Sequence, residues 1–295
     1  MRLLVTGGCG FKGSNFTRFI LQHYGPEMIT NVDALVSGNL QNVDGLAETY
    51  GERYEFLKAD LVDEQRMEAV FSAHQYYAVV HFAAEPVAHH DGTETADDAA
   101  GTVALLNRAR HHGVRRVILV TTDAAPCDAA VAAGLEAWKQ YGHEVVIVRG
   151  TSVYGPFQPF NRLIPRSVMG ALTDRPIPVV GKGDDLRDWL HVDDFSSAIF
   201  VALFDGRPGE TYEVRSGQEV RAIDVVHFVL DQLGKGRELI EFRPEAGPTS
   251  SRSNGSGNMR EELQWKPRHQ FEPALRETIQ WYVRNREWWQ GQLGH

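Results

Sequence analysis

Short apolar runs alternate with segments of helical spacing along the first half of the chain. The runs are rich in β-branched residues, as expected for strands buried on both faces of a sheet. Between these runs the apolar residues recur at helical spacing, which predicts helices, for example over 101–113 and 129–141. This alternation predicts an α/β fold with a doubly wound parallel sheet and right-handed crossovers. The expected strands are Leu3–Val5, Ile29–Asp33, Tyr54–Lys58, Ala78–Phe82, Arg116–Thr122 and Glu144–Arg149.

The first expected strand leads into a glycine-rich turn. Glycines stand at Gly7, Gly10 and Gly13, and a helical pattern follows them. Such a turn brings backbone N–H groups and the positive end of a helix to a diphosphate. The next strand ends at Asp33, about 20 residues beyond the turn, where a carboxylate can accept hydrogen bonds from an adenosine ribose. Together these features predict a Rossmann-type dinucleotide-binding unit.

Asp60 follows the third expected strand. The carboxyl ends of strands in open parallel sheets bind ligands, so Asp60 is a candidate for the cofactor site. An equally good interpretation makes it the N-cap of a helix that begins at Glu64.

The pattern becomes irregular beyond Arg149. We therefore expect a dinucleotide-binding domain over 1–150, and a smaller C-terminal lobe, mainly for substrate binding, over 151–295. An expected helix over Phe195–Phe204 and a short expected strand over Thr211–Val214 predict a return to the first domain at about 190–215.

The last expected helix, from Glu272 to about Gln290, carries an aromatic stripe. Aromatic side chains at such spacing usually pack against the body of a protein, so docking is favoured over a ligand platform. The stripe consists of Trp281, Tyr282, Trp288 and Trp289.

Composition limits the class of protein. The 295 residues are 42% hydrophobic and 23% charged, which is typical of a globular chain. No apolar run approaches the roughly 18 residues of a membrane span, and no signal-peptide pattern precedes the first strand, so we expect a cytoplasmic protein without a membrane partner. Two cysteines fit a reduced compartment, and the net charge of −9 argues against a nucleic-acid partner.

Ten short segments, in order along nearly the whole chain, resemble the extended short-chain dehydrogenase/reductase family. Within it, they are most similar to the nucleotide-sugar 4,6-dehydratases and epimerases. The segments are Thr6–Gly13, Asn31–Asp33, Ala59–Leu61, His81–Glu85, Gly101–Thr102, Thr121–Asp123, Tyr154–Pro156, Leu163–Pro165, Arg187–Asp194 and Trp265–Pro267.

The resemblance implies roles for particular residues. It places NAD on Gly7, Gly10, Gly13, Asp33 and Asp60, and a homodimer interface on the helices at 101–113 and 129–141. It assigns Arg187 to the diphosphate of a nucleotide sugar, a task suited to the planar fork of a guanidinium. The alternative for Arg187 is an ion pair with Asp184 or Asp185. Further substrate contacts are expected from Glu85, Asn161 and Arg252.

Several positions depart from the family pattern. Hydride-transferring members carry a Tyr and, four residues later, a Lys that lowers its pKa, but Cys127 and Val131 stand here. The Thr-Asp-Glu pattern of dehydratases retains Asp123 and has Ala124 in place of the glutamate. Lys12 occupies a normally apolar place in the glycine motif.

These departures favour a non-redox isomerase. The chain resembles the flavin-independent GDP-sugar pyranose/furanose mutases of nucleoside-antibiotic pathways, which carry an Arg-Asp-Trp motif like Arg187-Asp188-Trp189. In this hypothesis Arg187 stabilises the departing diphosphate, with Mg²⁺ as an option, and Asp188 or Asp123 is the base. Trp189 shapes the site, and NAD is bound but not consumed.

Two alternatives remain open: an NAD-dependent nucleotide-sugar 4,6-dehydratase or epimerase with atypical catalytic residues, and an inactive nucleotide-sugar-binding module. The polar residues after the fourth strand are secondary candidates for acid–base or metal chemistry, although a solvated loop is the simpler interpretation. They are Glu85, His89, His90 and Asp91.

Overall fold

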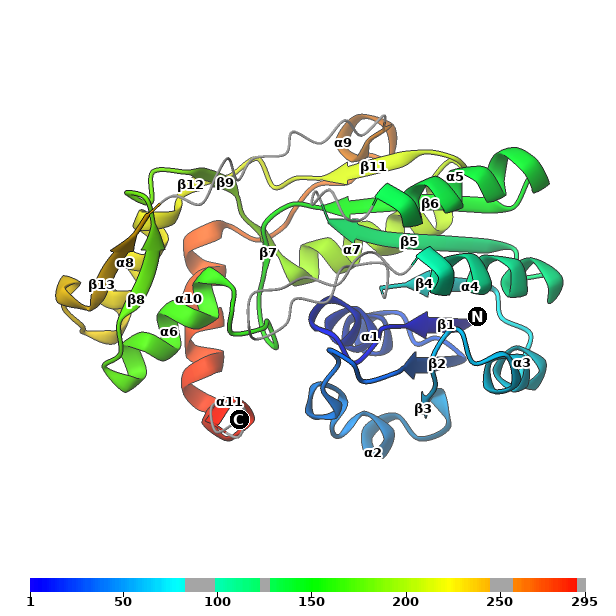
Figure 1. The fold of residues 1–295 in the computed structure, drawn as a ribbon, viewed down its shortest axis with the longest axis horizontal. Helices are drawn as coiled ribbons and strands as arrows, with labels where there is room; N and C mark the ends of the chain where they lie inside the picture. Colours follow the sequence, from blue (N-terminus) through cyan, green and yellow to red (C-terminus); the bar gives the residue numbers. More distant parts are fainter. Residues whose placement is uncertain (83–98, 123–127, 245–256, 291–295) are drawn as a thin grey trace. The chain divides into compact units, whose positions relative to one another are not determined.

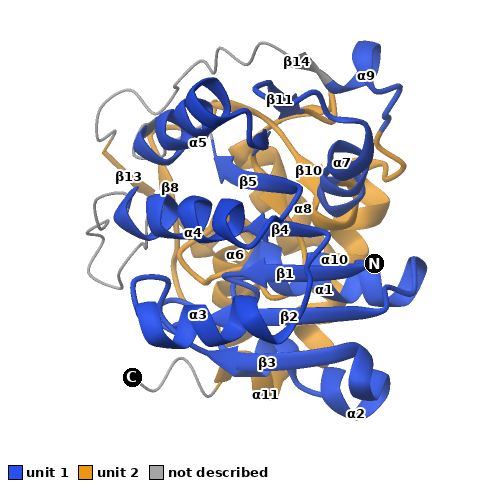
Figure 2. Ribbon diagram, turned by 90° about the vertical axis from the view of Figure 1, so that its right-hand side faces the viewer, with its two compact units in different colours: residues 1–150, 195–214, 252–266 blue, residues 151–194, 215–251, 267–295 orange. Residues whose placement is uncertain are grey.

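The computed structural model describes residues 1–82, 99–122, 128–244 and 257–290. Two compact units are present, and each is built from three segments of the chain (Figure 2). Unit 1 comprises 1–150, 195–214 and 252–266, and unit 2 comprises 151–194, 215–251 and 267–295. No helix in the described ranges is long and apolar enough to cross a membrane.

Unit 1 contains the expected doubly wound sheet (Figure 1). Its strand order is β14-β11-β6-β5-β4-β1-β2-β3, and every neighbouring pair is parallel. The α/β Rossmann-type prediction is therefore confirmed. The strands are β1 (Arg2–Thr6), β2 (Met28–Asp33), β3 (Tyr54–Lys58), β4 (Ala78–His81), β5 (Arg116–Thr122), β6 (Glu144–Gly150), β11 (Thr211–Val214) and β14 (Gly257–Asn258).

Helices cover both faces of this sheet, with α1 and α7 on one face and α3, α4 and α5 on the other (Figure 2). The central strands are consequently buried along their whole length, as in β4. The helices of unit 1 are α1 (Phe11–His23), η1 (Leu40–Val43), α2 (Leu46–Tyr50), η2 (Gly51–Arg53), α3 (Glu64–Ala73), α4 (Ala99–His111), α5 (Asp128–Tyr141), α7 (Val192–Asp205, whose first turn lies in unit 2) and α9 (Met259–Glu262).

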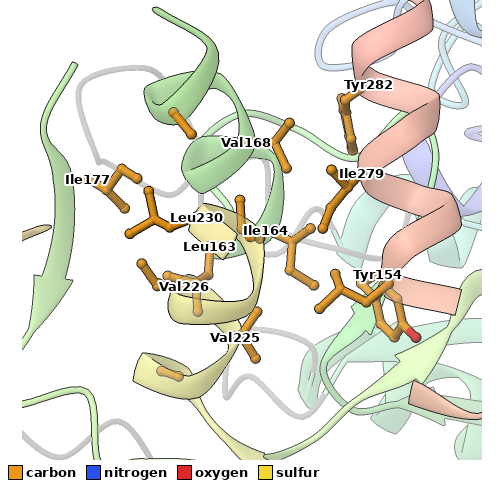
Figure 3. Close-up of a cluster of buried hydrophobic side chains, with 14 of the residues drawn as sticks. Tyr154, Leu163, Ile164, Val168, Ile177, Val225, Val226, Leu230, Ile279 and Tyr282 are labelled. Carbon is orange, nitrogen blue, oxygen red and sulfur yellow. The ribbon is translucent and has the colours of Figure 1, made fainter. Parts of the chain in front are cut away.

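In its described residues, unit 2 is a small helical layer with three two-stranded sheets. Apolar side chains of α6, α8 and α10 pack into one core (Figure 3). The elements are β7 (Val153–Tyr154), α6 (Leu163–Thr173), β8 (Ile177–Val180), β9 (Leu186–Asp188), β10 (Leu190–His191), β12 (Glu219–Arg221), α8 (Ala222–Leu233), η4 (Arg237–Leu239), β13 (Ile240–Arg243), α10 (Phe271–Arg284) and α11 (Arg286–Gln290).

The aromatic stripe near the C-terminus joins this core, as expected. Tyr282 and Trp289 are fully buried, and the Tyr282 hydroxyl donates to the carbonyl of Gly155. The single predicted helix is two helices, because α10 ends at Arg284 and α11 begins at Arg286. The indole N–H of Trp289 donates to the carbonyl of Tyr282 across this break.

Candidate functional site

The glycine turn after β1 has a backbone conformation and close contacts that leave no room for side chains at key positions. Gly7 has a positive φ of 73°. A Cβ on Gly13 would lie 2.3 Å from the carbonyl oxygen of Gly7 and 2.7 Å from the Cα of Gly8. The turn therefore passes against the first turn of α1 at a distance that only glycine allows.

The amino end of α1 is suited to an anion. Its N-cap is Gly10, which has no side chain with which to satisfy the first backbone N–H groups, and its first turn contains no acidic residue. Orphan N–H groups and the helix dipole favour a bound phosphate at such an end. The turn thus offers the cradle that a dinucleotide's diphosphate requires.

Asp33, at the carboxyl end of β2, is held beside this turn. Its carboxylate accepts hydrogen bonds from the backbone N–H groups of Cys9, at 2.9 Å, and Leu35, at 2.8 Å. Burial raises the pKa of Asp33, and the two N–H donors oppose that shift. Each carboxylate oxygen can accept another bond, so Asp33 retains the capacity to bind a ribose hydroxyl. The geometry therefore fits NAD.

Two neighbours of the turn have simpler roles. Burial raises the pKa of the Cys9 thiol to about 12, so it is a packed, unreactive side chain. The ammonium of Lys12 lies 5.4 Å from the centroid of the Phe195 ring, a cation–π contact within unit 1.

Asp60 is not a helix cap. The N-cap of α3 is Asp63, whose carboxylate accepts from the backbone N–H of Arg66 at 3.0 Å. Asp60 is exposed, and its carboxylate accepts from the N–H of Val62 in a local turn. The capping alternative is therefore wrong, whereas a role for Asp60 in cofactor binding stays a prediction.

His81 was not predicted as a functional residue. It is fully buried at the end of β4, 2.6 Å from the hydroxyl of Thr6 and 3.0 Å from that of Thr102. Burial lowers the pKa of His81 to about 3, so the imidazole is neutral and links β1, β4 and α4. Its role in the described structure is to hold these elements together.

A pocket of about 130 Å³ lies within unit 2, at the amino end of α6. Three arginines and one aspartate line it together with Asn161, so its formal charge is positive. Its charged residues are Arg162, Arg166, Asp185 and Arg187, and its apolar wall is Leu163, Val179, Val180 and Ala222. The predicted substrate residues Arg187 and Asn161 therefore lie in one pocket.

Arg187 is paired with Asp185 in this pocket. Its Nε and Nη2 both lie 2.6 Å from the same carboxylate oxygen, which is the alternative that the sequence left open. Burial and repulsion from Arg187 lower the pKa of Arg166, whose Nη atoms donate only long bonds to backbone carbonyls. A ligand phosphate fits such a set of donors, since guanidinium groups bind phosphate in bidentate fashion.

Sequence reasoning missed Arg162 and Arg166, whereas it did offer the pairing of Arg187 with Asp185 as an alternative. The spacing of the two arginines offered a signal, because positions i and i+4 lie on the same face of a helix. Arg162 is the N-cap of α6 and Arg166 lies one turn later.

Asp188 holds backbone in place. Its carboxylate accepts from the N–H and hydroxyl of Ser216, at 2.8 and 2.6 Å, and from the N–H of Gly217 at 2.9 Å. These bonds fix the segment before β12 against β9. Asp188 is thereby a positioning residue in this structure.

Trp189 belongs to the core of unit 2. It is 4% exposed, contacts the rings of Tyr154 and Phe271, and donates its indole N–H to the carbonyl of Val220. The guanidinium of Arg187 lies 5.9 Å from the centroid of its ring, and the predicted role of Trp189 in shaping the site stays a prediction. Glu85, Asp123 and Arg252 lie outside the described residues, as do His89, His90, Asp91, Ala124 and Cys127.

Comparisons with known proteins decide the family. The family model for GDP-mannose 4,6 dehydratase matches residues 4–125, and that for the NAD dependent epimerase/dehydratase family matches residues 128–214. A dTDP-glucose 4,6-dehydratase from Streptomyces niveus is 34% identical, over 98% of this chain and 95% of that protein. The chain belongs to the extended short-chain dehydrogenase/reductase family of nucleotide-sugar dehydratases and epimerases.

Solved structures of extended short-chain dehydrogenase/reductases agree with the fold. A dTDP-glucose 4,6-dehydratase from Bacillus anthracis, in complex with NAD, has a TM-score of 0.87 and 32% identity and covers 99% of both chains. A dTDP-glucose 4,6-dehydratase from Streptomyces venezuelae with NAD bound also has a TM-score of 0.87, with 29% identity.

These relatives overturn the mutase hypothesis. Three curated relatives, each matching 98% of this chain, are named as dTDP-glucose 4,6-dehydratases or a probable one; a dehydratase removes water, whereas a mutase is an isomerase. The expected closeness to GDP-sugar mutases, the isomerase activity and the GDP-sugar substrate are therefore wrong. The expectation that NAD is not consumed falls with them, while binding of NAD agrees with the NAD-bound homologous structures.

Proposed function

We propose that this protein binds NAD and a nucleoside diphosphate hexose, with dTDP-glucose as the first candidate, and removes water from the sugar. The observation that carries the proposal is the 34% identity to a dTDP-glucose 4,6-dehydratase over 98% of the chain. The NAD-compatible glycine turn and the arginine pocket support it from the geometry of each unit.

In this proposal, one set of residues binds NAD and another binds the sugar nucleotide. Gly7, Gly10 and Gly13 bring backbone to the diphosphate of NAD, and Asp33 accepts from its adenosine ribose. NAD, when bound, supplies a hydride acceptor and donor. Arg187 and Arg166, with the amino end of α6, hold the diphosphate of the sugar nucleotide.

The proton-transfer groups of this protein are unusual. Asp123 is the one acid retained from the Thr-Asp-Glu pattern, because Ala124 follows it, and Cys127 and Val131 replace the Tyr and Lys. General acid–base help is typically worth ~10²–10⁴-fold in rate. We therefore expect dehydration to be slower than in relatives that carry the complete set, with Asp123 as the acid.

The experiment is incubation of purified protein with dTDP-glucose and NAD, followed by mass spectrometry and NMR of the sugar nucleotide. Loss of one water, with a keto carbon at C4, is the expected result. An Asp123→Asn variant tests the acid, and it should abolish the product while binding of dTDP-glucose persists. A product that keeps its water and changes only its ring size would contradict the proposal.

A second candidate is a binding module without turnover, favoured by Ala124, Cys127 and Val131. Calorimetric titration separates the two, since this candidate predicts saturable binding of NAD and dTDP-glucose with no product after prolonged incubation.

A cytoplasmic location and a homodimer through α4 and α5 stay predictions. Light scattering in solution checks the homodimer.

A further inference from the structure

A cluster of two histidines and an aspartate lies within unit 2, apart from the arginine pocket. We propose that His191, Asp193 and His269 form a binding site for a divalent transition-metal ion such as Zn²⁺. The inference does not rest on the proposed function, because neither the glycine turn nor the arginine pocket includes these residues.

The donor atoms are already close together. One ligand atom from each of the three residues lies within 4.8 Å of the others. Nδ1 of His191 is 3.8 Å from the nearer carboxylate oxygen of Asp193. Two ligands bonded to Zn²⁺ at ~2.0–2.1 Å stand roughly 3.0–3.5 Å apart at tetrahedral or octahedral angles, so small side-chain rotations close the set.

The surroundings hold the two imidazoles in place. His191 is 9% exposed, and its ring contacts those of Tyr154, at 5.4 Å, and His269, at 4.3 Å between centroids. Nδ1 of His191 accepts a long bond of 3.3 Å from the backbone N–H of Asp193, so this nitrogen carries a lone pair, which a bound ion would take over.

Asp194 orients the second histidine. Its carboxylate, 3% exposed, lies 2.9 Å from Nδ1 of His269 and also accepts from the backbone N–H groups of Arg268 and His269. A carboxylate behind a metal-binding histidine fixes the ring and raises its basicity, a recurrent arrangement in zinc sites. Because Nδ1 of His269 faces Asp194, Nε2 is the nitrogen left to bind the ion.

The donor chemistry selects the class of ion. Two imidazole nitrogens and one carboxylate suit Zn²⁺, Ni²⁺ or Co²⁺, whereas Mg²⁺ and Ca²⁺ prefer all-oxygen ligands. Asp193 is 46% and His269 32% exposed at their side chains, so the ion has an entry path and water can complete its coordination. A bound ion would fasten the segment 191–194 to the segment 267–269.

The experiment is calorimetric titration of the tag-free, chelator-treated full chain with ZnCl₂ at about pH 8, where the ion competes little with the His269 proton. We expect one saturable Zn²⁺ per chain and a rise in melting temperature with Zn²⁺, since a ligand of the folded state stabilises it. Under the same conditions MgCl₂ should give neither effect.

Variants assign the ion to this cluster. Asp193→Asn and His269→Gln, both at partly exposed side chains, should each weaken Zn²⁺ binding by ~10-fold or more. His23→Gln, at an exposed histidine of unit 1, is the matched control and should bind like the wild type. Absence of saturable Zn²⁺ binding, or equal affinity in Asp193→Asn, His269→Gln and the control, would overturn the proposal. Melting curves without metal show whether each variant is folded.

Discussion

At the scale of single residues, Asp185 is the feature that most affects the arginine pocket. Its carboxylate accepts a hydrogen bond from the guanidinium of Arg187. A ligand phosphate in the pocket would accept from the same guanidinium. A ligand that binds the edge of Arg187 formed by Nε and Nη2 must therefore displace Asp185. Because both side chains are 37% exposed, water screens the pair and its net contribution is small.

We expect Asp185→Asn to tighten the binding of dTDP by up to ~5-fold, corresponding to the loss of a pair worth at most ~1 kcal/mol. Calorimetry with dTDP measures the change. Asp184→Asn is the matched control, since Asp184 is 63% exposed, lies 3.7 Å from Arg221 and does not line the pocket. Weaker binding in Asp185→Asn would show that the carboxylate positions Arg187 for the ligand.

Gly13→Ala should abolish NAD binding, because its Cβ would lie 2.3 Å from the carbonyl oxygen of Gly7 and the turn would have to open. Titration with NAD measures the loss. Gly142→Ala controls for destabilisation. At Gly142 φ is +66° and a Cβ meets open space, so the substitution costs about 1–2 kcal/mol of backbone strain and leaves NAD binding intact. If Gly13→Ala binds NAD normally, the turn is not the cofactor site.

Sequence reasoning at this scale succeeded where a residue acts through its own backbone position. The tight turn at Gly13 and the place of Asp33 at the end of β2 follow from local spacing, whereas their contact with NAD stays a prediction. The partners of Asp188 could not be predicted, because Ser216 and Gly217 reach it across an antiparallel pair whose register no local pattern encodes.

At the scale of elements, Arg116 joins two strands and a helix. It lies at the start of β5 with a side chain that is 10% exposed, pairs with Glu144 at 2.8 Å and donates to the carbonyls of Leu203 and Phe204 in the last turn of α7. The guanidinium therefore satisfies helix-end carbonyls that would otherwise lack partners.

We expect Arg116→Met to lower the free energy of unfolding by about 2–4 kcal/mol, because Glu144 and the two carbonyls lose a buried charged donor. Urea denaturation measures it. Arg115→Met is the control: Arg115 lies 3.6 Å from the same Glu144 but is 65% exposed, so its removal should cost at most ~1 kcal/mol. Equal losses in the two variants would contradict the assigned role of Arg116.

Strands were easier to predict than helix ends. β3, β5 and β11 have the predicted bounds, and the apolar run of β5 is buried at every position except the last. The start of α7 was expected near Phe195 but lies at Val192, since Asp193 and Asp194 are acidic residues that favour the first turn of a helix.

At the scale of the whole molecule, the order of segments limits what local patterns reveal. The segment 252–266 belongs to unit 1, where the two-residue strand β14 pairs with β11 at the edge of the sheet and the indole N–H of Trp265 donates to the hydroxyl of Ser197. Such a short strand has no hydrophobic period.

The predicted isomerase function was wrong because a few substituted positions outweighed the similarity of nearly the whole chain to dehydratases.

The buried histidine His81 makes the free energy of unfolding of the whole molecule depend on pH. Its folded-state pKa of about 3 is below the value of about 6.5 in an unfolded chain, so the unfolded state binds more protons below pH 6.5. The contribution of the neutral His81 to the free energy of unfolding is therefore fully present above pH 6.5. It is lost as the pH falls toward 3. From about pH 7 to about pH 5 the expected loss from His81 is about 2 kcal/mol.

Replacing His81 with Gln, which keeps a donor and an acceptor for Thr6 and Thr102, removes this titration. We expect urea denaturation of His81→Gln to show a loss of unfolding free energy between about pH 7 and about pH 5 that is smaller than the wild-type loss by about 2 kcal/mol. The comparison is of pH dependence, so a lower stability of the variant at every pH does not affect it. His23→Gln, at an exposed side chain, should keep the wild-type dependence. An unchanged dependence in His81→Gln would mean that His81 accepts a proton within the folded protein, and that its link between β1, β4 and α4 does not require a neutral ring.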